Sequence, residues 1–255
     1  MIILGCGSSS GVPEIGCFCA VCTSKNTRNK RSRVSVFIEE NGANLLIDSS
    51  PDFRQQALQN NILRVDAVLY THDHADHTNG LDDLRAFNKL SGNSLPVFGD
   101  AETLGTIQER FPYAFQPKPD KIWYRPSLVP NILPDEPIHQ TNILGVPVTA
   151  FQQTHGKVTT LGYRIKNFAY STDTNEMPET AFESLAGVEV WVVDCLRYTE
   201  SYTHSNLKRT LGWIERVKPR LAVLTHMAHE FDYDALSGEL PVGVVPGYDG
   251  MVVEL

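Results

Sequence analysis

The chain has 255 residues, of which 42% are hydrophobic and 20% are charged, and its formal net charge is −8. These values are ordinary for a globular protein, so they exclude a disordered or fibrous chain. The acidic balance argues against long nucleic acids and anionic membranes as partners, because it provides no molecule-wide positive field. All apolar runs are far shorter than the ~20 residues of a membrane span, and the first residues lack a signal-peptide pattern. We therefore expect a cytoplasmic protein.

Short apolar runs alternate with helix-like segments along the whole chain, which predicts a single α/β domain over residues 1–255. The Asn41-Gly42 pair between two apolar runs favours an early β-hairpin. Strands are expected at residues 34–39, 44–48, 67–71, 95–99, 146–152, 161–165, 168–171, 188–194, 220–225 and 250–253. Helices are expected at residues 51–60, 81–90, 102–111, 178–185, 207–217 and 233–236. Hairpins combined with helices predict two sheets with helices outside them.

A proline-rich insertion interrupts this pattern at about residues 112–137, where seven prolines occur within 26 residues. Proline removes a backbone donor and fixes φ, so we expect no regular element there. Long irregular loops in compact domains are often lids, binding loops or subunit contacts. A simple surface loop and a substrate or dimer contact are both open at this point.

Three cysteines, Cys17, Cys19 and Cys22, lie close together in a loop of about residues 16–24. The total of five cysteines is odd, which suits reduced thiols better than a disulfide framework. Three thiolates could bind one tetrahedral zinc ion if a fourth ligand comes from elsewhere, and His229 is the best candidate. Such a site would hold the N-terminal loop near His226. The alternative is three free thiols, some of them only packed.

Histidines are concentrated directly after the strand expected at 67–71, where His72, His74, Asp76 and His77 fall within six residues. This density predicts a metal site built on a loop, because a strand would send adjacent side chains to opposite faces. Further candidate ligands follow three other expected strands, and the carboxyl ends of strands in a layered α/β fold meet at one edge. These are His155, Asp173 and His226. The donor set lacks a thiolate, so zinc and manganese are both chemically suitable.

The ordered motif His72-x-His74-x-Asp76-His77, followed by His155, Asp173 and His226, resembles the metallo-β-lactamase superfamily. The resemblance implies an α/β fold that is a four-layer αβ/βα sandwich, with two mixed β-sheets flanked by helices. It also implies two catalytic divalent ions. His72, His74 and His155 would bind one ion, Asp76, His77 and His226 the other, and Asp173 would bridge both. Two ions about 3.5–4 Å apart can share a water, lower its pKa and clamp a phosphoryl oxygen.

Asp48 matches in position a family Asp that orients a metal-binding His, although Ser50 stands where many relatives have glycine. Several stretches resemble the phosphodiesterase branch typified by PhnP: the Leu4 to Pro13 segment, the cysteine cluster, and residues 171–174, 193–195, 224–232 and 247–251. That likeness implies one structural zinc on Cys17, Cys19, Cys22 and His229, a homodimer, and small phosphodiester substrates such as 2',3'-cyclic nucleotides or a ribosyl cyclic phosphate.

His204 matches the residue that protonates the leaving oxygen in this branch, and it lies just before the helix expected at 207–217. We expect the helix dipole and nearby cations to lower the pKa of His204 until a bound diester anion raises it. As a general acid it favours substrates with a poor leaving group, such as an alkoxide. The simpler interpretation is a surface histidine before a helix cap.

Three other functions remain open for these residues. One is a tRNA 3'-processing endonuclease, although the cysteine cluster replaces that group's Thr-x-x-Arg-Asn continuation and the chain is acidic. A second is a non-catalytic protein of the pyrroloquinoline-quinone pathway, which shares the cysteine loop but does not explain the complete ligand set. A third is a thioester or lactone hydrolase. The leading expectation is a hydrolase of small cyclic or nucleoside-derived phosphodiesters, with two catalytic zinc or manganese ions and one structural zinc.

Overall fold

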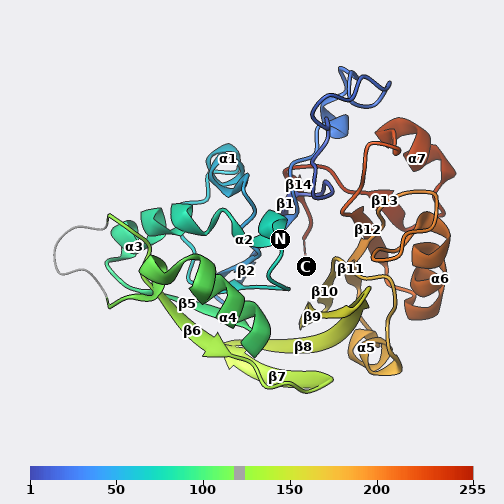
Figure 1. Ribbon diagram of the computed structural model, residues 1–255. Coiled ribbons are helices and arrows are strands. Elements are labelled where there is room, and N and C mark those ends of the chain that lie inside the picture. Colours follow the sequence, from blue (N-terminus) through green and yellow to red (C-terminus); the bar gives the residue numbers. More distant parts are fainter. Residues whose placement is uncertain (118–123, 255) are drawn as a thin grey trace.

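The computed structural model describes residues 1–117 and 124–254 and contains two seven-stranded mixed sheets packed face to face (Figure 1). The first sheet has the order β14 (Met251–Val252), β1 (Ile2–Gly5), β2 (Ser35–Glu40), β3 (Ala43–Ile47), β4 (Ala67–Leu69), β5 (Leu95–Gly99) and β6 (Leu128–Ile132). The second has the order β13 (Val244–Pro246), β12 (Leu221–Thr225), β11 (Val190–Asp194), β10 (Phe168–Ser171), β9 (Val158–Ile165), β8 (Val146–His155) and β7 (Ile138–Ile143). The predicted αβ/βα sandwich is confirmed.

Helices cover the outer faces of both sheets. Beside the first sheet lie α1 (Phe53–Gln59), α2 (Ala75–Thr78), η2 (Leu81–Leu84), α3 (Arg85–Ser91), α4 (Ala101–Arg110) and η3 (Pro112–Phe115). Beside the second lie α5 (Glu179–Leu185), α6 (Leu207–Val217) and α7 (Tyr233–Glu239), while the 3-10 turn η1 (Thr27–Asn29) belongs to the N-terminal segment. Asn206 caps α6 by accepting a hydrogen bond from the Arg209 amide, as residues before a helix often do.

Alternation along the strands of the first sheet separates two cores. On β3, Leu45 and Ile47 pack into the core that also holds the second sheet, whereas Leu46 packs into the core under the outer helices. On β2, Val36 and Ile38 face inward in the same way and Phe37 faces outward. Successive strand residues point to opposite faces, so a strand that is apolar at every position is buried on both sides. This pattern produces the four layers.

The parallel half of each sheet lies where the chain crosses over through helices. In the first sheet β3, β4, β5 and β6 are parallel, and in the second β10, β11, β12 and β13 are parallel. The other strands of each sheet pair in antiparallel fashion, including the β2–β3 hairpin predicted from Asn41-Gly42. Parallel strands end at one common edge, and loops at this edge carry the candidate ligands.

The expectation that the proline-rich insertion contains no regular element is wrong within its described part. Residues Pro112–Phe115 form η3, and Leu128–Ile132 form β6, which pairs in parallel with β5 and places Pro130 opposite Val97. β6 is the edge strand of its sheet, so Pro130 can occupy it without breaking a central ladder. The middle of the insertion, residues 118–123, lies outside the described residues, and so does the choice between a surface loop and a substrate or dimer contact there.

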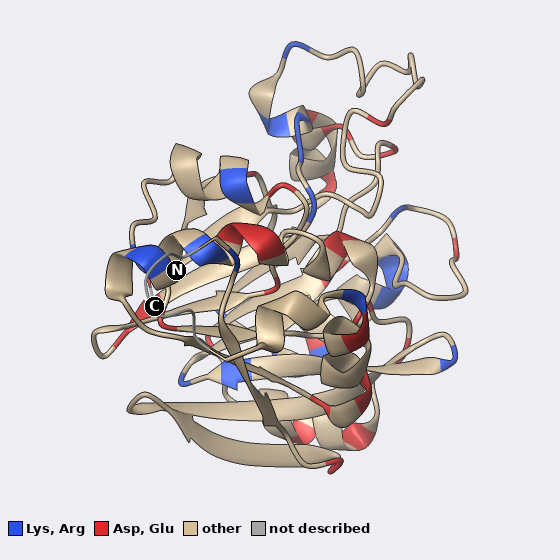
Figure 2. Ribbon diagram, turned by 60° about the vertical axis from the view of Figure 1, so that its left-hand side comes forward, with Lys and Arg blue, Asp and Glu red and all other residues tan. Residues whose placement is uncertain are grey.

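The N-terminal segment between β1 and β2 rises from the sheets and lies beside α7 (blue in Figure 1). The Asn29 side chain fixes this contact. Its Nδ2 donates to Oδ2 of Asp232, and its Oδ1 accepts from the backbone amide of Tyr233. Lys and Arg are interspersed with Asp and Glu over the molecule, with several basic residues along this segment (Figure 2). None of the described helices combines the length and hydrophobicity that a membrane span requires.

Candidate metal centre

Strand ends from both sheets converge on one site. Asp48 follows β3, His72 lies three residues after β4, His155 ends β8, Asp173 lies two residues after β10, and His226 follows β12. Three of these residues, Asp48, Asp173 and His226, have left-handed backbones with φ of 60°, 50° and 57°. Non-glycine residues rarely adopt this conformation, and it concentrates at functional sites. Here each strained residue turns the chain sharply at the end of its strand.

Asp173 divides the site, because its two carboxylate oxygens face different histidines. Oδ2 lies 3.7 Å from Nε2 of His72 and 3.7 Å from Nε2 of His155. Oδ1 lies 3.2 Å from Nε2 of His77 and 3.3 Å from Nε2 of His226. A carboxylate shared between two groups of imidazoles suits a pair of adjacent cations, because each of its oxygens can bind one of them.

The remaining predicted ligands complete the two groups. His74 belongs to the group of His72, His155 and Asp173, while Oδ2 of Asp76 lies 3.4 Å from Nε2 of His77 and 3.6 Å from Nε2 of His226. In each group the ligand atoms lie within 4.8 Å of one another. The structure therefore brings together all seven residues proposed from the sequence, in the same two sets.

Several histidine nitrogens in this site have no hydrogen-bond partner, and this bears on whether the site suits metal ions. Nε2 of His72, of His77 and of His226 is buried and makes no hydrogen bond within the described part of the chain. Buried polar atoms are normally hydrogen-bonded, so several buried nitrogens without a hydrogen-bond partner in one site need an explanation. Imidazole nitrogens and carboxylate oxygens are ligands of zinc and manganese. The residues fit two divalent ions.

Hydrogen bonds from neighbouring residues orient the imidazoles with Nε2 free. Nδ1 of His77 lies 2.8 Å from Oδ2 of Asp48, and Nδ1 of His72 lies 3.0 Å from Oγ1 of Thr71. Nδ1 of His155 donates to the carbonyl oxygen of Thr203 at 2.7 Å. A proton held on Nδ1 leaves the lone pair on Nε2, the tautomer that a metal ligand needs. The Asp48 contact agrees with its proposed role, despite Ser50.

The prediction that the whole histidine motif lies on a loop is wrong. Asp76 and His77 are on the short helix α2, with His74 at its N-cap position. Successive residues on a helix diverge by about 100°, yet both side chains reach the same set because α2 stands directly against the strand ends. The chain hydrogen-bonds this helix to the β3 loop, since the Ser49 amide donates to the His77 carbonyl at 2.8 Å.

Charge interactions within the site oppose the cost of burial. Burial favours the neutral acid, but His226, His77 and His204 hold the pKa of Asp173 well below its usual range. Burial favours neutral His77, but Asp173, Asp76 and Asp48 raise the pKa of that imidazole well above its usual value. Burial together with neighbouring histidines lowers the pKa of His72. The Asp173 carboxylate is therefore ionised and able to bind cations.

His204 lies beside His226, with the two rings stacked and their centroids 4.5 Å apart. Its Nδ1 donates to Oδ2 of Asp194 at 3.0 Å, and its Nε2 lies 3.9 Å from Oδ2 of Asp173. The expected lowering of its pKa involved nearby cations, and the protein's own groups act on it in the opposite direction. Burial does lower it, but Asp194 and Asp173 outweigh burial and raise the pKa of His204 to about 9.

Sequence reasoning gave no role to Asp194, although this residue lies in one of the stretches that carry the resemblance, residues 193–195. It is fully buried at the end of β11, and the same Oδ2 also accepts the Thr174 amide at 2.9 Å. An acidic residue at the end of the apolar run Val190 to Val193 was the available signal. Its partner is ten residues away in sequence, so only the fold shows that it orients His204.

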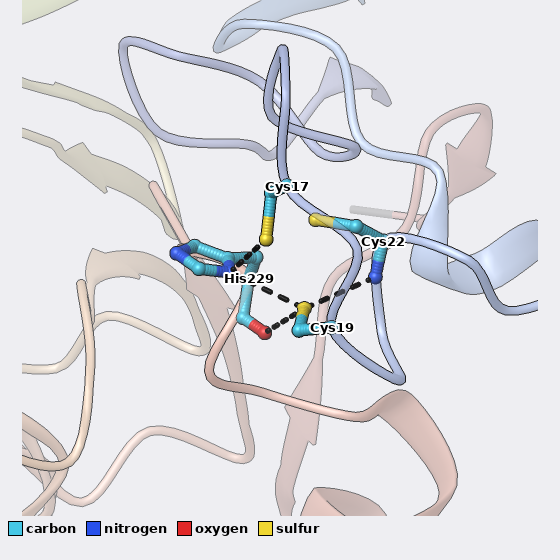
Figure 3. A group of neighbouring side chains, drawn as sticks. All are labelled: Cys17, Cys19, Cys22 and His229. Carbon is cyan, nitrogen blue, oxygen red and sulfur yellow. Dashed lines mark hydrogen bonds between the residues drawn. The ribbon is translucent and has the colours of Figure 1, made fainter.

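The second predicted metal site also assembles. Cys17, Cys19, Cys22 and His229 place their ligand atoms within 4.8 Å of one another (Figure 3). Sγ of Cys17 and Sγ of Cys19 each lie 3.4 Å from Nδ1 of His229. Contact with His229 lowers the pKa of Cys19 to about 6, which favours the thiolate that binds zinc. Nε2 of His229 lies 3.1 Å from Oε2 of Glu14. Zinc-binding histidines typically donate the N–H of their second ring nitrogen to a carboxylate in this way.

Comparison with known proteins agrees with this geometry. The model of the protein family described as "Beta-lactamase superfamily domain" matches residues 43–227. The chain belongs to the metallo-β-lactamase superfamily. A solved structure titled "Crystal Structure of a New Diphosphatase from the PhnP Family" matches with a TM-score of 0.91 and 32% identity, covering 99% of this chain and 96% of that one. The chain thus has the fold of this superfamily and is similar to this PhnP-family structure.

Two further relatives extend the comparison. An octanoyltransferase of Porphyromonas gingivalis is 34% identical over 253 residues, which are 98% of this chain and 50% of that protein. The chain therefore spans about half the length of this relative. The zinc-bound PqqB of Methylobacterium extorquens has a TM-score of 0.78 at 20% identity, with 100% of this chain and 99% of that chain covered. At that identity the likeness shows the fold.

Proposed function

We propose that the protein is a dinuclear-metal phosphodiesterase that hydrolyses small cyclic or nucleoside-derived phosphodiesters. The observation that carries this proposal is the position of Asp173, whose two oxygens face two separate ligand sets. His72, His74 and His155 would hold one ion, and Asp76, His77 and His226 the other, with Asp173 between them. When bound, two divalent ions supply a Lewis-acid clamp for a phosphoryl oxygen and generate a nucleophile from water at neutral pH.

His204 is the proposed proton donor. Asp194 holds the Nδ1–H, so the proton on Nε2 is directed toward the Asp173 side of the site. Nε2 would transfer its proton to the leaving alkoxide oxygen, and Asp194 would keep the ring in the same orientation before and after transfer. An alcohol leaving group needs this proton far more than a nitrophenolate does, which supports diesters of alcohols as substrates.

The cysteine site would hold a structural zinc rather than take part in the reaction. His229 lies three residues after His226, so one short segment joins both candidate metal sites. Arg31 supports this segment, because its buried guanidinium donates to the carbonyl oxygens of Ala228 and Phe231. Zinc on Cys17, Cys19, Cys22 and His229 would tie the N-terminal segment to this support.

A substrate panel tests the proposal. The purified protein, loaded separately with zinc and with manganese, is assayed with 2',3'-cyclic nucleotides, linear diesters, a lactone and an octanoyl thioester. The thioester is included because one relative is named an octanoyltransferase. We expect the cyclic nucleotides to give the highest kcat/KM. Turnover of the lactone or thioester with no hydrolysis of any diester would overturn the proposal, as would a metal content below two ions per chain after loading.

A further inference from the structure

His226 differs from the other buried histidines of the metal centre in the contact of its second ring nitrogen. Nδ1 of His72, of His77 and of His155 each has a hydrogen-bond partner on the chain. Nδ1 of His226 is buried and has no such partner among the residues that the structure describes. A histidine that binds metal almost always donates the N–H of its second nitrogen. The described chain therefore does not supply the contact that would fix the tautomer and ring orientation of His226.

Two further buried atoms without a partner lie on the adjoining strand ends. Oγ1 of Thr225, the residue before His226, and Oδ1 of Asp194 are both buried, and neither has a hydrogen-bond partner on the described part of the protein. Asp194 is opposite Thr225 where β11 runs parallel to β12, so their side chains leave the same face of the sheet. None of the three residues is more than 1% exposed. Unpaired polar atoms are costly at such depth, so a ligand is expected among them.

The spacing of these groups suits one bridging water. A carboxylate oxygen of Asp194 and a ring nitrogen of His226 belong to a set of ligand atoms that lie within 4.8 Å of one another. A direct hydrogen bond requires about 2.7–3.2 Å, whereas two hydrogen bonds through one water span roughly 4.6 Å. A buried water typically makes about three hydrogen bonds to groups that would otherwise be unpaired. Here it would accept from the Nδ1–H of His226 and from the Thr225 hydroxyl, and it would donate to Oδ1 of Asp194.

We propose that a buried water bridges Nδ1 of His226, Oγ1 of Thr225 and Oδ1 of Asp194, and that Thr225 is a positioning residue of the metal centre. The inference rests on the two-ion centre of the proposed function and is independent of its substrate. Asp194 then serves two histidines, because its Oδ2 accepts from Nδ1 of His204 at 3.0 Å while its Oδ1 holds the water. The proposed proton donor and one metal ligand thus share a single buried carboxylate.

A high-resolution crystal structure of the zinc-loaded protein tests the water directly. We expect one density peak within hydrogen-bond distance of all three atoms, with no anomalous signal at the zinc edge. An anomalous signal would show a third ion in place of the water, and a direct contact between Nδ1 of His226 and Asp194 would leave no room for one. Either result, or the lack of any density there, would overturn the proposal.

Thr225→Val tests the positioning role, because valine has the shape of threonine without the hydroxyl. We expect the affinity for the ion of Asp76, His77 and His226 to fall by roughly tenfold, the lower end of the usual effect of losing such an outer partner. The affinity for the ion of the other set should stay at the wild-type value. Metal titration measures total binding, and anomalous scattering gives the occupancy of each site separately. Thr225→Ser keeps the hydroxyl and should bind both ions as the wild type does.

Thr149→Val is the matched control. Thr149 lies on β8 of the same sheet and belongs to neither ligand set, so the same change of side chain there should leave both affinities unchanged. Wild-type affinity for both ions in Thr225→Val would overturn the positioning role, as would an equal loss in Thr225→Ser. Neither test uses a substrate. If no diester were hydrolysed, the proposed function would fail, and the density and the metal affinities would still decide for or against the water.

Discussion

Oδ2 of Asp48 lies 2.8 Å from Nδ1 of His77, and both side chains are completely buried. Asp48 also accepts hydrogen bonds from the Thr71 amide and the Thr71 hydroxyl, each at 2.8 Å. These bonds fix the carboxylate, and the carboxylate fixes the imidazole with Nε2 facing Asp173 and Asp76. Asp48 therefore positions His77, a ligand of the candidate metal centre, by contacting Nδ1 and leaving Nε2 to face the other ligands.

Asp48→Asn should weaken metal binding, because an amide can donate to Nδ1 and so favour the wrong tautomer of His77. We expect the affinity for one of the two ions to fall by about 10- to 100-fold, the usual effect of losing such a partner. Metal titration followed by mass-spectrometric metal analysis measures it. Asp66→Asn, which also loses a carboxylate bonded to a backbone amide, is the control and should bind metal normally.

His204→Ala should slow hydrolysis of alkyl esters by about 10²- to 10⁴-fold, the range typical of a lost general acid. Hydrolysis of bis(p-nitrophenyl) phosphate should fall far less, because nitrophenolate leaves without a proton. Steady-state kinetics with both substrates gives the comparison. Equal losses on the two substrates would remove the proton-donor role and point instead to a part in substrate or metal binding.

Asp194→Asn should shift the alkaline limb of the kcat profile for an alkyl ester to lower pH. Asp194 is the leading attraction that raises the pKa of His204, to about 9, against the effect of burial. Removal of its charge lowers that pKa, so the protonated acid is lost at a lower pH. pH–rate profiles of the variant and the wild type test this. A limb that stays in place would mean that His204 does not control it.

Cys17→Ser should lower the melting temperature more than it lowers turnover per folded molecule. Loss of one thiolate leaves an incomplete tetrahedral site, and the binding energy of structural zinc contributes to folding. We expect one metal ion fewer per chain, with the N-terminal segment more sensitive to protease. Calorimetric melting, metal analysis and activity per folded chain are measured together. Normal melting combined with lost activity would contradict the structural assignment.

Gly80→Ala should destabilise the fold around the metal centre. A Cβ at Gly80 would lie 1.9 Å from the carbonyl oxygen of Ser50, and the Gly80 amide donates to the Ser49 carbonyl at 2.9 Å. Backbone must move to relieve this contact, so the free energy of unfolding should fall by about 1–3 kcal/mol or more. Denaturant unfolding measures the loss.

Gly105→Ala provides the control for that substitution. Gly105 lies within α4, and a Cβ there would meet nothing within 4 Å. Alanine favours a helix interior over glycine by about 0.5–1 kcal/mol, so this variant should be slightly more stable than the wild type. If both variants lost stability equally, the close approach of Gly80 to Ser50 would not be the cause.

Residue types and their order along the chain predicted the fold class and the candidate metal ligands. Donor side chains such as His72, His155 and His226 could be recognised because each follows an apolar run, and strand ends converge in a layered α/β fold. The proline-rich insertion was misread over β6, because its prolines do not reveal that Leu128–Ile132 lies at the edge of a sheet. Edge position depends on neighbours that are distant in sequence.

The sequence by itself determined the chemistry, that is, which side chains could bind metal and in what order they occur. The tertiary structure decided how they divide into two sets around Asp173, that Asp48 orients His77, and that Asp194 holds His204 and raises its pKa. The physical reason is that ligand type is local and covalent. Orientation, burial and charge interactions depend instead on distances between segments that only the packing of the two sheets brings together.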